Sequence, residues 1–224
     1  MARKTKEESE KTRTRILESA RRVFHQRGFN QSSLEQIAQD AGLTRGAVYW
    51  HFKDKADLLF SLREDVSAPL TRRVDALLES ETHPCALDAI EAAMKEFFIA
   101  LDDNPVLRQV FEIMATRCEF VGEFSDMQEE LDRPAKEFLV KMEGVYARAL
   151  RQNELLAPVP PAIAARDTWI FINGLMRLVL GSRRDPALER EIPQTIAAHI
   201  ALRRAPRPAP RTPPGRPRPL TNPE

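Results

Sequence analysis

Apolar residues recur at every third or fourth position along most of this 224-residue chain. That spacing places them on one side of an α-helix, which then buries this side against its neighbours. No segment alternates apolar and polar residues for long enough to indicate a β-strand, and only 8 glycines interrupt the pattern. The chain is therefore expected to fold as an all-α protein of about nine helices.

Glycine and proline mark where the expected helices end. Gly28 and Gly42 each follow an apolar repeat, where glycine adopts the left-handed backbone that ends a helix. Pro69 lies inside the fourth repeat and predicts a kink or a break, because it lacks a backbone donor. The expected helices cover residues 9–27, 34–41, 45–51, 55–78, 85–102, 105–118, 123–153, 162–182 and 187–203.

Two of these helices are short and follow each other closely. Ser33 and Gln36 have the spacing of a capping box, and Thr44 caps a second helix just after the first has ended at Gly42. Two short helices joined through a glycine and one apolar residue form a helix-turn-helix, whose second helix enters the major groove of DNA. This motif predicts DNA binding.

The second helix of the motif carries side chains suited to DNA. Gly46 and Ala47 are small enough to let the backbone approach base edges. Arg45 fits a bidentate contact with guanine, and Tyr49 fits a phosphate or a thymine methyl group. The alternative is that the two small residues only pack tightly and Arg45 is a solvated surface charge. The predicted DNA-binding residues are Arg3, Lys4, Lys6, Ser33, Thr44, Arg45, Gly46, Ala47, Tyr49, Trp50, His51 and Lys55, the last two at phosphates.

The string TRGAVYWHFKDKADLL that starts at Thr44 resembles the DNA-binding domain of the TetR family of bacterial transcriptional regulators. The resemblance covers roughly residues 9–60. It implies that Trp50 and Phe52 mainly pack the third helix against the first and fourth. The residues that match the family's Y-W-H-F-x-x-K signature are Tyr49, Trp50, His51, Phe52 and Lys55.

Two further segments resemble the subgroup of this family that represses multidrug efflux pump operons, the acridine-resistance type of regulator. They are the opening MARKTKEE and RCEFVGEF at residues 117–124, which lies outside the DNA-binding segment. The resemblance implies that a basic arm over residues 1–8 touches DNA, since a flexible arm can reach a minor groove or the phosphates. A solvated terminus is the alternative.

Charge is unevenly distributed, although the net charge is only +1. Residues 1–60 hold 12 Lys or Arg and 8 Asp or Glu (+4), residues 61–200 hold 16 and 24 (−8), and residues 201–224 hold 6 and 1 (+5). A basic front before an acidic body indicates that one end meets a polyanion. Residues 204–224, rich in proline, are expected to be a disordered tail whose arginines are either solvated or in contact with DNA.

The DNA-binding domain is expected over residues 9–55 and the body over residues 56–203. Met and aromatic residues at helical spacing in the body fit an ordinary core or a cavity for apolar compounds. The family resemblance favours the cavity, because the corresponding helices enclose the effector site. Asn173 is the most suggestive member, since a carboxamide in an apolar helix needs a partner. The predicted effector-binding residues are Val66, Ile90, Met94, Phe97, Phe111, Met114, Phe138, Met142, Trp169, Ile172, Asn173 and Met176.

The last two expected helices carry more apolar residues than one chain needs to bury. By resemblance, they pair with their copies across a two-fold axis, which matches a palindromic operator. The predicted dimer residues are Leu175, Leu178, Val179, Ile192, Ile196 and Ile200.

Several other classes lack support. No run of 18 apolar residues and no apolar signal segment is present, so a cytoplasmic protein without a membrane partner is expected. No paired carboxylates, nucleophile with a base, or phosphate-binding glycine loop indicates an enzyme or a cofactor. Cys85 and Cys118 have no metal-ligand spacing, so neither a disulfide nor a metal site is expected, and Cys118 is interpreted as a buried structural thiol.

These observations together predict a homodimeric repressor that binds a double-stranded palindromic operator. A small apolar or amphipathic effector is expected to release it, with coupling through the fourth helix, and by resemblance it controls a multidrug efflux operon. Two alternatives stay open. One is a TetR-type regulator of a metabolic operon that senses an acyl or aromatic metabolite, and the other is an architectural DNA-binding protein without an effector.

Overall fold

The computed structural model describes residues 2–80, 85–119, 127–181 and 185–206. Within these residues the chain forms nine α-helices and no β-strand, as the apolar spacing predicts. The helices are α1 (Ala2–Arg27), α2 (Leu34–Asp40), α3 (Arg45–His51), α4 (Lys55–Glu79), α5 (Ala86–Asp103), α6 (Pro105–Thr116), α7 (Met127–Arg151), α8 (Pro161–Val179) and α9 (Pro186–Ala201).

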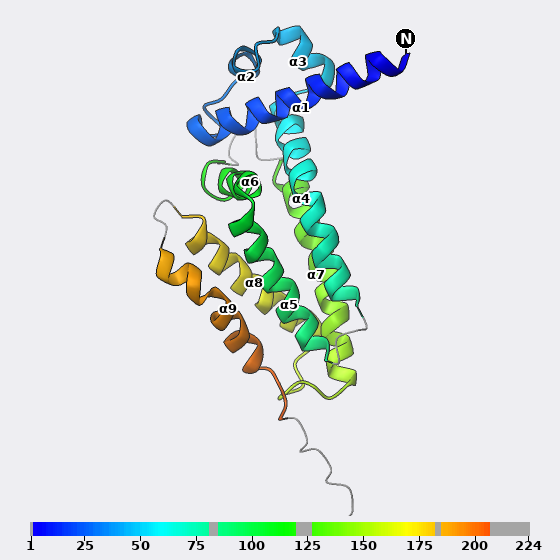
Figure 1. Cartoon of the computed structure of the whole chain (residues 1–224). Helices are drawn as coiled ribbons and strands as arrows, with labels where there is room; N and C mark the ends of the chain where they lie inside the picture. Colours follow the sequence, from blue (N-terminus) through cyan, green and yellow to red (C-terminus); the bar gives the residue numbers. More distant parts are fainter. Residues whose placement is uncertain (1, 81–84, 120–126, 182–184, 207–224) are drawn as a thin grey trace, which may run out of the picture.

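Helices α1 to α3 form a compact head at one end of the molecule (Figure 1). Gly28 and Gly42 end α1 and α2 with φ of 81° and 61°, which confirms the two predicted left-handed stops. The apolar stripe of α1 is buried as expected. Its members are Ile16, Leu17, Ala20, Val23 and Phe24, none more than 6% exposed.

The structure corrects the start of α1. The helix begins at Ala2, so the prediction of a flexible arm over residues 1–8 is wrong from residue 2 onward. Residues 2–10 contain no Gly or Pro and are rich in Lys and Glu, which favour helix, and Lys11 pairs with Glu7 at 2.8 Å one turn away. This segment has no apolar stripe, which is why its helical character was missed. It projects past the top of α4 (Figure 1).

Helix α4 connects the head to the body and runs unbroken through Pro69 (Figure 1). The predicted break does not occur. Pro69 is exposed, whereas Leu70, Val74 and Leu78 are buried against the body. The single backbone hydrogen bond lost at proline is outweighed by the burial of this apolar side.

Below the head, α5, α7, α8 and α9 run along the length of the molecule, and α6 lies beneath α1 (Figure 1). The buried apolar residues form two clusters, one in the head and one in the body. Helix α6 belongs to both, because Val110 and Ile113 pack into the head cluster while Leu107 packs into the body cluster. The expected start of α7 at residue 123 lies outside the described residues.

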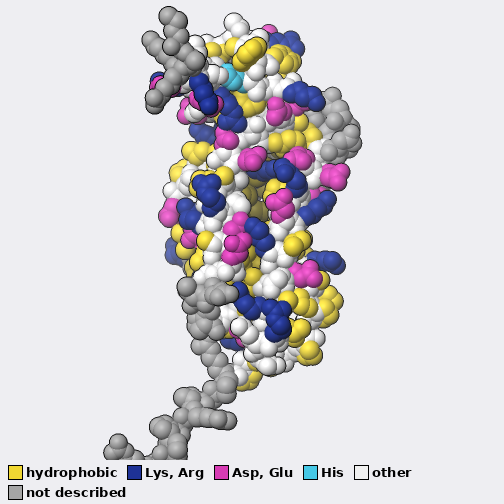
Figure 2. All heavy atoms as spheres, turned by 90° about the vertical axis from the view of Figure 1, so that its right-hand side faces the viewer, with side chains coloured by type: hydrophobic (Ala, Val, Ile, Leu, Met, Phe, Trp, Pro, Cys, Tyr) yellow, Lys and Arg dark blue, Asp and Glu magenta, His cyan; other side chains and the backbone are white. Residues whose placement is uncertain are grey.

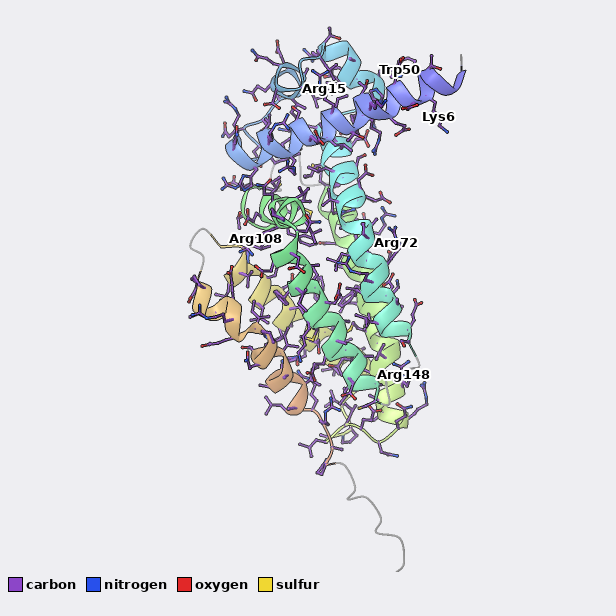
Figure 3. The ribbon with its side chains drawn as sticks, viewed as in Figure 1. Lys6, Arg15, Trp50, Arg72, Arg108 and Arg148 are labelled. Carbon is purple, nitrogen blue, oxygen red and sulfur yellow. The ribbon has the colours of Figure 1, made fainter. Side chains whose placement is uncertain are left out.

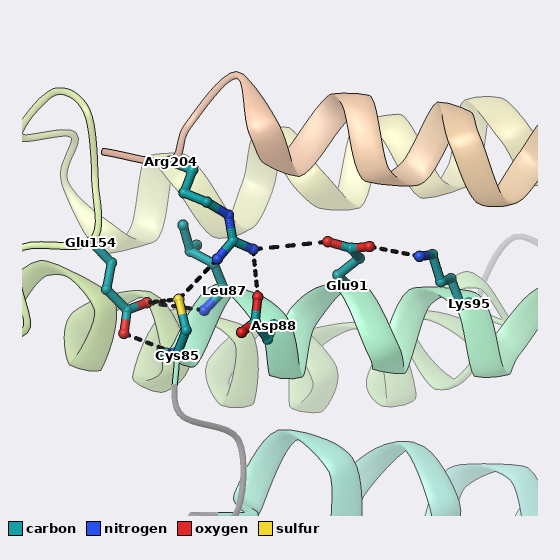
Figure 4. A network of polar contacts seen from close by, with 8 residues as sticks. Cys85, Leu87, Asp88, Glu91, Lys95, Glu154 and Arg204 are labelled. Atoms are coloured by element: carbon teal, nitrogen blue, oxygen red, sulfur yellow. Dashed lines mark hydrogen bonds and ion pairs between the residues drawn. The ribbon is translucent and has the colours of Figure 1, made fainter. Parts of the chain in front are cut away.

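A polar network (Figure 4) lies at the start of α5, at the end of the body away from the head (Figure 1). The carboxylate of Glu154 accepts hydrogen bonds from the backbone N–H groups of Ala86 and Leu87, at 3.0 and 3.1 Å, and so caps α5. Arg204 donates to Asp88 at 2.6 Å. The predicted tail boundary at residue 204 is therefore wrong, because Arg204 is held in the fold; residues 207–224 lie outside the described part of the chain.

Candidate functional site

The helix-turn-helix is held by the caps that the sequence predicts. The Ser33 hydroxyl accepts from the N–H of Gln36 at 3.2 Å, and the Gln36 side chain accepts from the N–H of Ser33 at 3.0 Å. The Thr44 hydroxyl accepts from the N–H of Ala47 at 3.2 Å. These bonds satisfy backbone donors at the starts of α2 and α3 and fix the residue at which each short helix begins.

Helix α3 presents one side to the head and the other to solvent. Val48 is buried, whereas Arg45 and Tyr49 are exposed. Arg45 donates to the Tyr49 hydroxyl at 3.1 Å, and its guanidinium carbon lies 5.2 Å from the centre of the Tyr49 ring. A Cβ atom added to Gly46 would meet only the Thr44 hydroxyl, at an ordinary 3.9 Å, so the fold does not require a glycine there. The bare backbone at Gly46 is available to an approaching ligand.

The structure corrects the role of Trp50. Its side chain is 83% exposed, so the predicted packing of Trp50 against the first and fourth helices is wrong. Figure 3 shows it on the surface of the head, at the same end as Lys6. Phe52 is 2% exposed and packs as predicted. An exposed indole on the α3 surface is suited to contact a partner rather than the core.

The structure also corrects the role of Lys55. Its ammonium group donates to the backbone carbonyls of Phe29, Asn30 and Ser32, at 2.9, 3.3 and 2.9 Å. An ammonium group has three N–H donors, so these contacts account for all of them. The prediction that Lys55 binds a phosphate is wrong, because the lysine instead fixes the turn between α1 and α2.

The remaining predicted DNA residues take different positions. Ser33 and Thr44 use their hydroxyls as caps, and Lys6 is exposed on the extension of α1. His51 is half-buried beside Phe52, with the two ring centres 6.3 Å apart. The side chains of Arg3 and Lys4 lie outside the described part of the structure.

The body contains a cavity of about 210 Å³ between α4, α5, α6, α7 and α8. Two aromatic pairs form its walls, Phe97 with Phe111 at 5.3 Å between ring centres and Phe138 with Trp169 at 5.6 Å. Figure 2 shows the face of the body on the side of α4 and α7, where basic and acidic side chains alternate around a hollow with apolar side chains inside it. The lining residues are Leu70, Thr71, Val74, Asp75, Ala93, Met94, Phe97, Phe111, Pro134, Ala135, Glu137, Phe138, Lys141, Trp169, Ile172, Asn173 and Met176.

Eight of the twelve predicted effector residues line this cavity and four do not. Ile90 and Met142 are fully buried in the body core, while Val66 and Met114 pack at the edge of a core cluster. Helical spacing identifies the inward side of a helix but does not separate core from cavity wall. The predicted residues that line the cavity are Met94, Phe97, Phe111, Phe138, Trp169, Ile172, Asn173 and Met176.

The polar part of the lining was missed, except for Asn173. Its side-chain amide donates to the backbone carbonyl of Trp169 at 2.8 Å, and no described residue donates to its Oδ1 atom. Lys141 and Asp75 form an ion pair of 2.5 Å between α7 and α4. Charged residues on an amphipathic helix usually face solvent, so their spacing gave no signal of a cavity.

Five of the six predicted dimer residues face the interior of their own chain. None of them is more than 6% exposed, so the prediction that they form an interface is wrong for these five. Only Leu178 is exposed, at 58%. It continues a stripe on α8 with Ile163 and Ile170, which are 56% and 64% exposed. The five buried residues are Leu175, Val179, Ile192, Ile196 and Ile200.

Comparison with known proteins agrees with this geometry. Residues 16–62 match the model of the bacterial regulatory proteins of the tetR family. The transcriptional regulator AcrR of Shigella flexneri is 33% identical over 206 residues, which cover 90% of this chain and 94% of AcrR. The chain belongs to the TetR family. The resemblance carried by TRGAVYWHFKDKADLL is thereby confirmed.

Further relatives of this TetR-family regulator are also transcriptional regulators. TtgR of Pseudomonas putida is 30% identical over 177 residues, 79% of this chain and 84% of TtgR. Among solved structures, NalD, the secondary repressor of the MexAB-OprM multidrug efflux pump in Pseudomonas aeruginosa, aligns with a TM-score of 0.78 at 31% identity, covering 88% of this chain and 98% of NalD. A complex of SmeT with triclosan aligns with a TM-score of 0.74 at 27% identity over 91% and 99% of the two chains.

The Y-W-H-F-x-x-K signature of this TetR-family regulator divides into two roles. Phe52 and Lys55 hold the head together, whereas Tyr49 and Trp50 face solvent on α3. A shared signature therefore does not show by itself which of its residues contact DNA.

The pKa values of both thiols of the regulator lie above the ordinary value of a cysteine. Burial raises the pKa of the Cys118 thiol to about 12, and burial together with the neighbouring Glu154 carboxylate raises the pKa of Cys85. Across the described residues, no three His, Cys, Asp or Glu side chains are placed to hold a metal ion. No helix in the same residues is long and apolar enough to cross a bilayer.

Proposed function

We propose that this TetR-family regulator is a homodimeric repressor of a multidrug efflux operon, released from its operator by a small apolar or amphipathic compound. The observation that carries the proposal is one chain with an exposed DNA-reading helix and a separate aromatic cavity, connected by α4. NalD is a repressor of a multidrug efflux pump, and SmeT forms a complex with triclosan, which supports both parts of the proposal.

Operator recognition would use the exposed side of α3. Arg45 reads a guanine, Tyr49 and Trp50 contact the sugar-phosphate backbone or thymine methyl groups, and Gly46 lets the helix approach closely. Lys6 on the extended α1 lies at the same end of the head as Trp50 (Figure 3), where it can pair with a phosphate. Two such heads, about 34 Å apart, fit successive major grooves on one face of DNA.

The second copy would dock on the exposed stripe of α8. Ile163, Ile170 and Leu178 are each more than half exposed and follow one another at helical spacing. Exposed apolar stripes of this kind mark interaction surfaces. Gly174, between Ile170 and Leu178, has open space around it, so a partner helix can approach the backbone. An isologous contact through α8 and the adjacent α9 gives the two-fold symmetry of a palindromic operator.

The effector would bind between the two aromatic pairs. Flat apolar surfaces stack on such rings, and the free Oδ1 of Asn173 accepts one hydrogen bond from the ligand. The cavity of about 210 Å³ is smaller than the roughly 300 to 1,000 Å³ typical of drug-sized ligands. An effector that enters fully and fills more than this volume moves the walls apart, and Leu70 and Val74 of α4 belong to those walls. This displacement is the step that disturbs the heads.

The test starts from the source genome. Genomic fragments retained by the purified full-length protein are sequenced, and we expect one palindrome upstream of an efflux operon. Anisotropy of the labelled palindrome then measures operator affinity with and without triclosan, which should weaken binding about 5- to 150-fold. Fragments with no shared sequence, bound in a steeply salt-dependent manner, would instead show an architectural protein. A palindrome whose affinity no planar aromatic compound changes would refute the effector part.

A further inference from the structure

Helix α4 is not the only connection between head and body. The start of the α1–α2 turn binds the chain that follows α6, because the Phe29 N–H donates to the Arg117 carbonyl at 2.9 Å. Asn30 and Glu119 exchange two hydrogen bonds, of 2.8 and 2.9 Å. Helix α6 therefore contacts the head independently of α4, and its buried residues pack in both apolar clusters.

A chain of polar contacts crosses this second connection. In the head, the His25 Nε2 atom lies 3.0 Å from Glu112 Oε2 on α6. The other carboxylate oxygen of Glu112 accepts from Arg108 Nε at 3.2 Å. Arg108 Nη2 donates to the Val179 carbonyl at 2.7 Å and to Glu189 Oε1 at 3.0 Å. One continuous path thus joins α1 in the head to the end of α8 and the first turn of α9.

Arg108 is the centre of this path and is only 8% exposed. A buried guanidinium is costly unless its donors are satisfied, and here they meet two carboxylates and one carbonyl. Val179 is the last residue of α8, where backbone carbonyls lack helical partners, so Arg108 acts as a cap for that helix. Figure 3 labels Arg108 on α6, just below the head.

The effector cavity touches the same two helices. Phe111 lies on α6 between Arg108 and Glu112 in sequence, and Met176 lies on α8 one turn before Val179; both line the cavity. A ligand that displaces Phe111 or Met176 shifts the helices that Arg108 joins. Charge-assisted hydrogen bonds depend strongly on distance and direction, so the path holds in one arrangement of the two helices and breaks in another.

We propose that Arg108 is a positioning residue that couples the effector cavity to the DNA-reading head through Glu112 and His25. This coupling rests on the proposed function, because it requires an effector that weakens operator binding. It adds a second route beside α4, and it connects the heads to α8 and α9, which carry the proposed dimer surface. Arg108 itself touches neither DNA nor effector.

The test compares coupling ratios, meaning the operator Kd with triclosan divided by the Kd without it. For the wild-type protein we expect a ratio of about 5 to 150, and for Arg108→Met a ratio at least about threefold lower than the wild-type ratio, with the remaining coupling passing through α4. The Kd for triclosan, from tryptophan fluorescence, and the operator Kd without triclosan should each change less than about threefold, since Arg108 contacts neither ligand. Lys95→Met is the matched control, because it breaks a 2.6 Å ion pair with Glu91 within α5, outside α4 and outside the path, and should keep the full ratio.

A second variant protects the test against misfolding of Arg108→Met. His25→Ala removes the head end of the path at a half-buried position and should lower the ratio in the same way. The double variant should then lower it no further than either single change, because both interrupt one path. A wild-type ratio near 1 would overturn the proposed function and the coupling together. A large wild-type ratio that survives in His25→Ala would overturn the coupling alone.

Discussion

The head and the body of this TetR-family regulator are stabilised in different ways. The head packs its three helices around an apolar cluster and adds local contacts, namely hydroxyl caps, two left-handed glycines and the three carbonyl contacts of Lys55. The body instead packs long amphipathic helices around a cavity of about 210 Å³. Side chains in a close-packed cluster cannot shift without moving their neighbours, whereas methionine and aromatic side chains that face a cavity can adjust to a ligand. The head is therefore suited to DNA recognition, and the body is suited to effector binding.

The largest effect is expected from the exposed side of α3, which is the proposed DNA-binding surface. Arg45→Ala removes one proposed guanine contact per head, at about 1 to 3 kcal/mol each, so a dimer loses about 2 to 6 kcal/mol of operator binding. The melting temperature and the triclosan affinity should not change, because Arg45 is exposed on α3. Anisotropy with labelled operator measures the loss. Arg72→Ala, an exposed arginine on α4, is the control, and an equal loss there would show a general charge effect instead.

A change inside the head should act on folding instead. Lys55→Met removes three hydrogen bonds from one ammonium group to the α1–α2 turn, and we expect the free energy of unfolding to fall by about 3 kcal/mol. Urea denaturation followed by circular dichroism measures it. The exposed neighbour Lys53 provides the control, since Lys53→Met should change stability by less than about 0.5 kcal/mol. Equal stability of the two variants would contradict the structural role of Lys55.

A substitution in the cavity wall should weaken effector binding and leave operator binding unchanged. Phe138→Ala removes one ring of the Phe138–Trp169 pair, and triclosan affinity should weaken about tenfold, which corresponds to about 1.4 kcal/mol. Operator affinity without triclosan should stay the same. Titration by tryptophan fluorescence gives the Kd, and Val140→Ala, two residues away and 71% exposed, is the control. Loss of operator binding in Phe138→Ala without triclosan would show that this wall of the cavity also holds the heads in the arrangement that binds DNA.

A smaller effect is expected at Gly46, where one substitution should raise the stability of α3 and weaken operator binding. Gly46→Ala has room in the fold and should stabilise α3 by up to about 1 kcal/mol, because alanine favours helix over glycine. The same methyl group should weaken operator binding if the backbone approaches base edges there. Thermal melting and anisotropy on one preparation separate the two effects. Unchanged operator affinity would show that the α3 backbone does not approach the base edges closely at Gly46.

Sequence patterns predicted the head better than the body for a physical reason. Caps and left-handed glycines act within four residues, so the spacing of Ser33 to Gln36 or the position of Gly42 is enough to locate a helix end. The roles of Trp50 and Lys55 depend on the tertiary packing around α3 and α4. Nothing in the signature itself distinguishes an exposed indole from a packed one.

In the body, the sequence correctly predicted which side of each helix faces inward. It did not show whether a residue on that side packs in the core, lines the cavity or meets a partner. Phe97 lines the cavity and Ile90, on the same helix, is fully buried in the core, although both belong to one apolar stripe. Likewise, Leu178 is exposed on α8 while Leu175 is buried, because the two residues point to different sides of the helix. Only the placement of neighbouring helices separates core, cavity and interface.

The smallest effect concerns the two thiols, one at the head and one in the body. Cys118 packs against the head cluster and Cys85 lies in the body. At pH 8 a thiol with an ordinary pKa near 8.5 is about one-quarter ionised, whereas the pKa of about 12 at Cys118 leaves about one thiolate in 10⁴. Since only the thiolate reacts, Cys118 in the native protein should show almost no labelling by an aromatic disulfide reagent, and Cys85, whose pKa is also raised, should label more slowly than an exposed cysteine. In urea both thiols should label fully, and rapid labelling of one thiol in the native protein would show that its region opens more readily than the other.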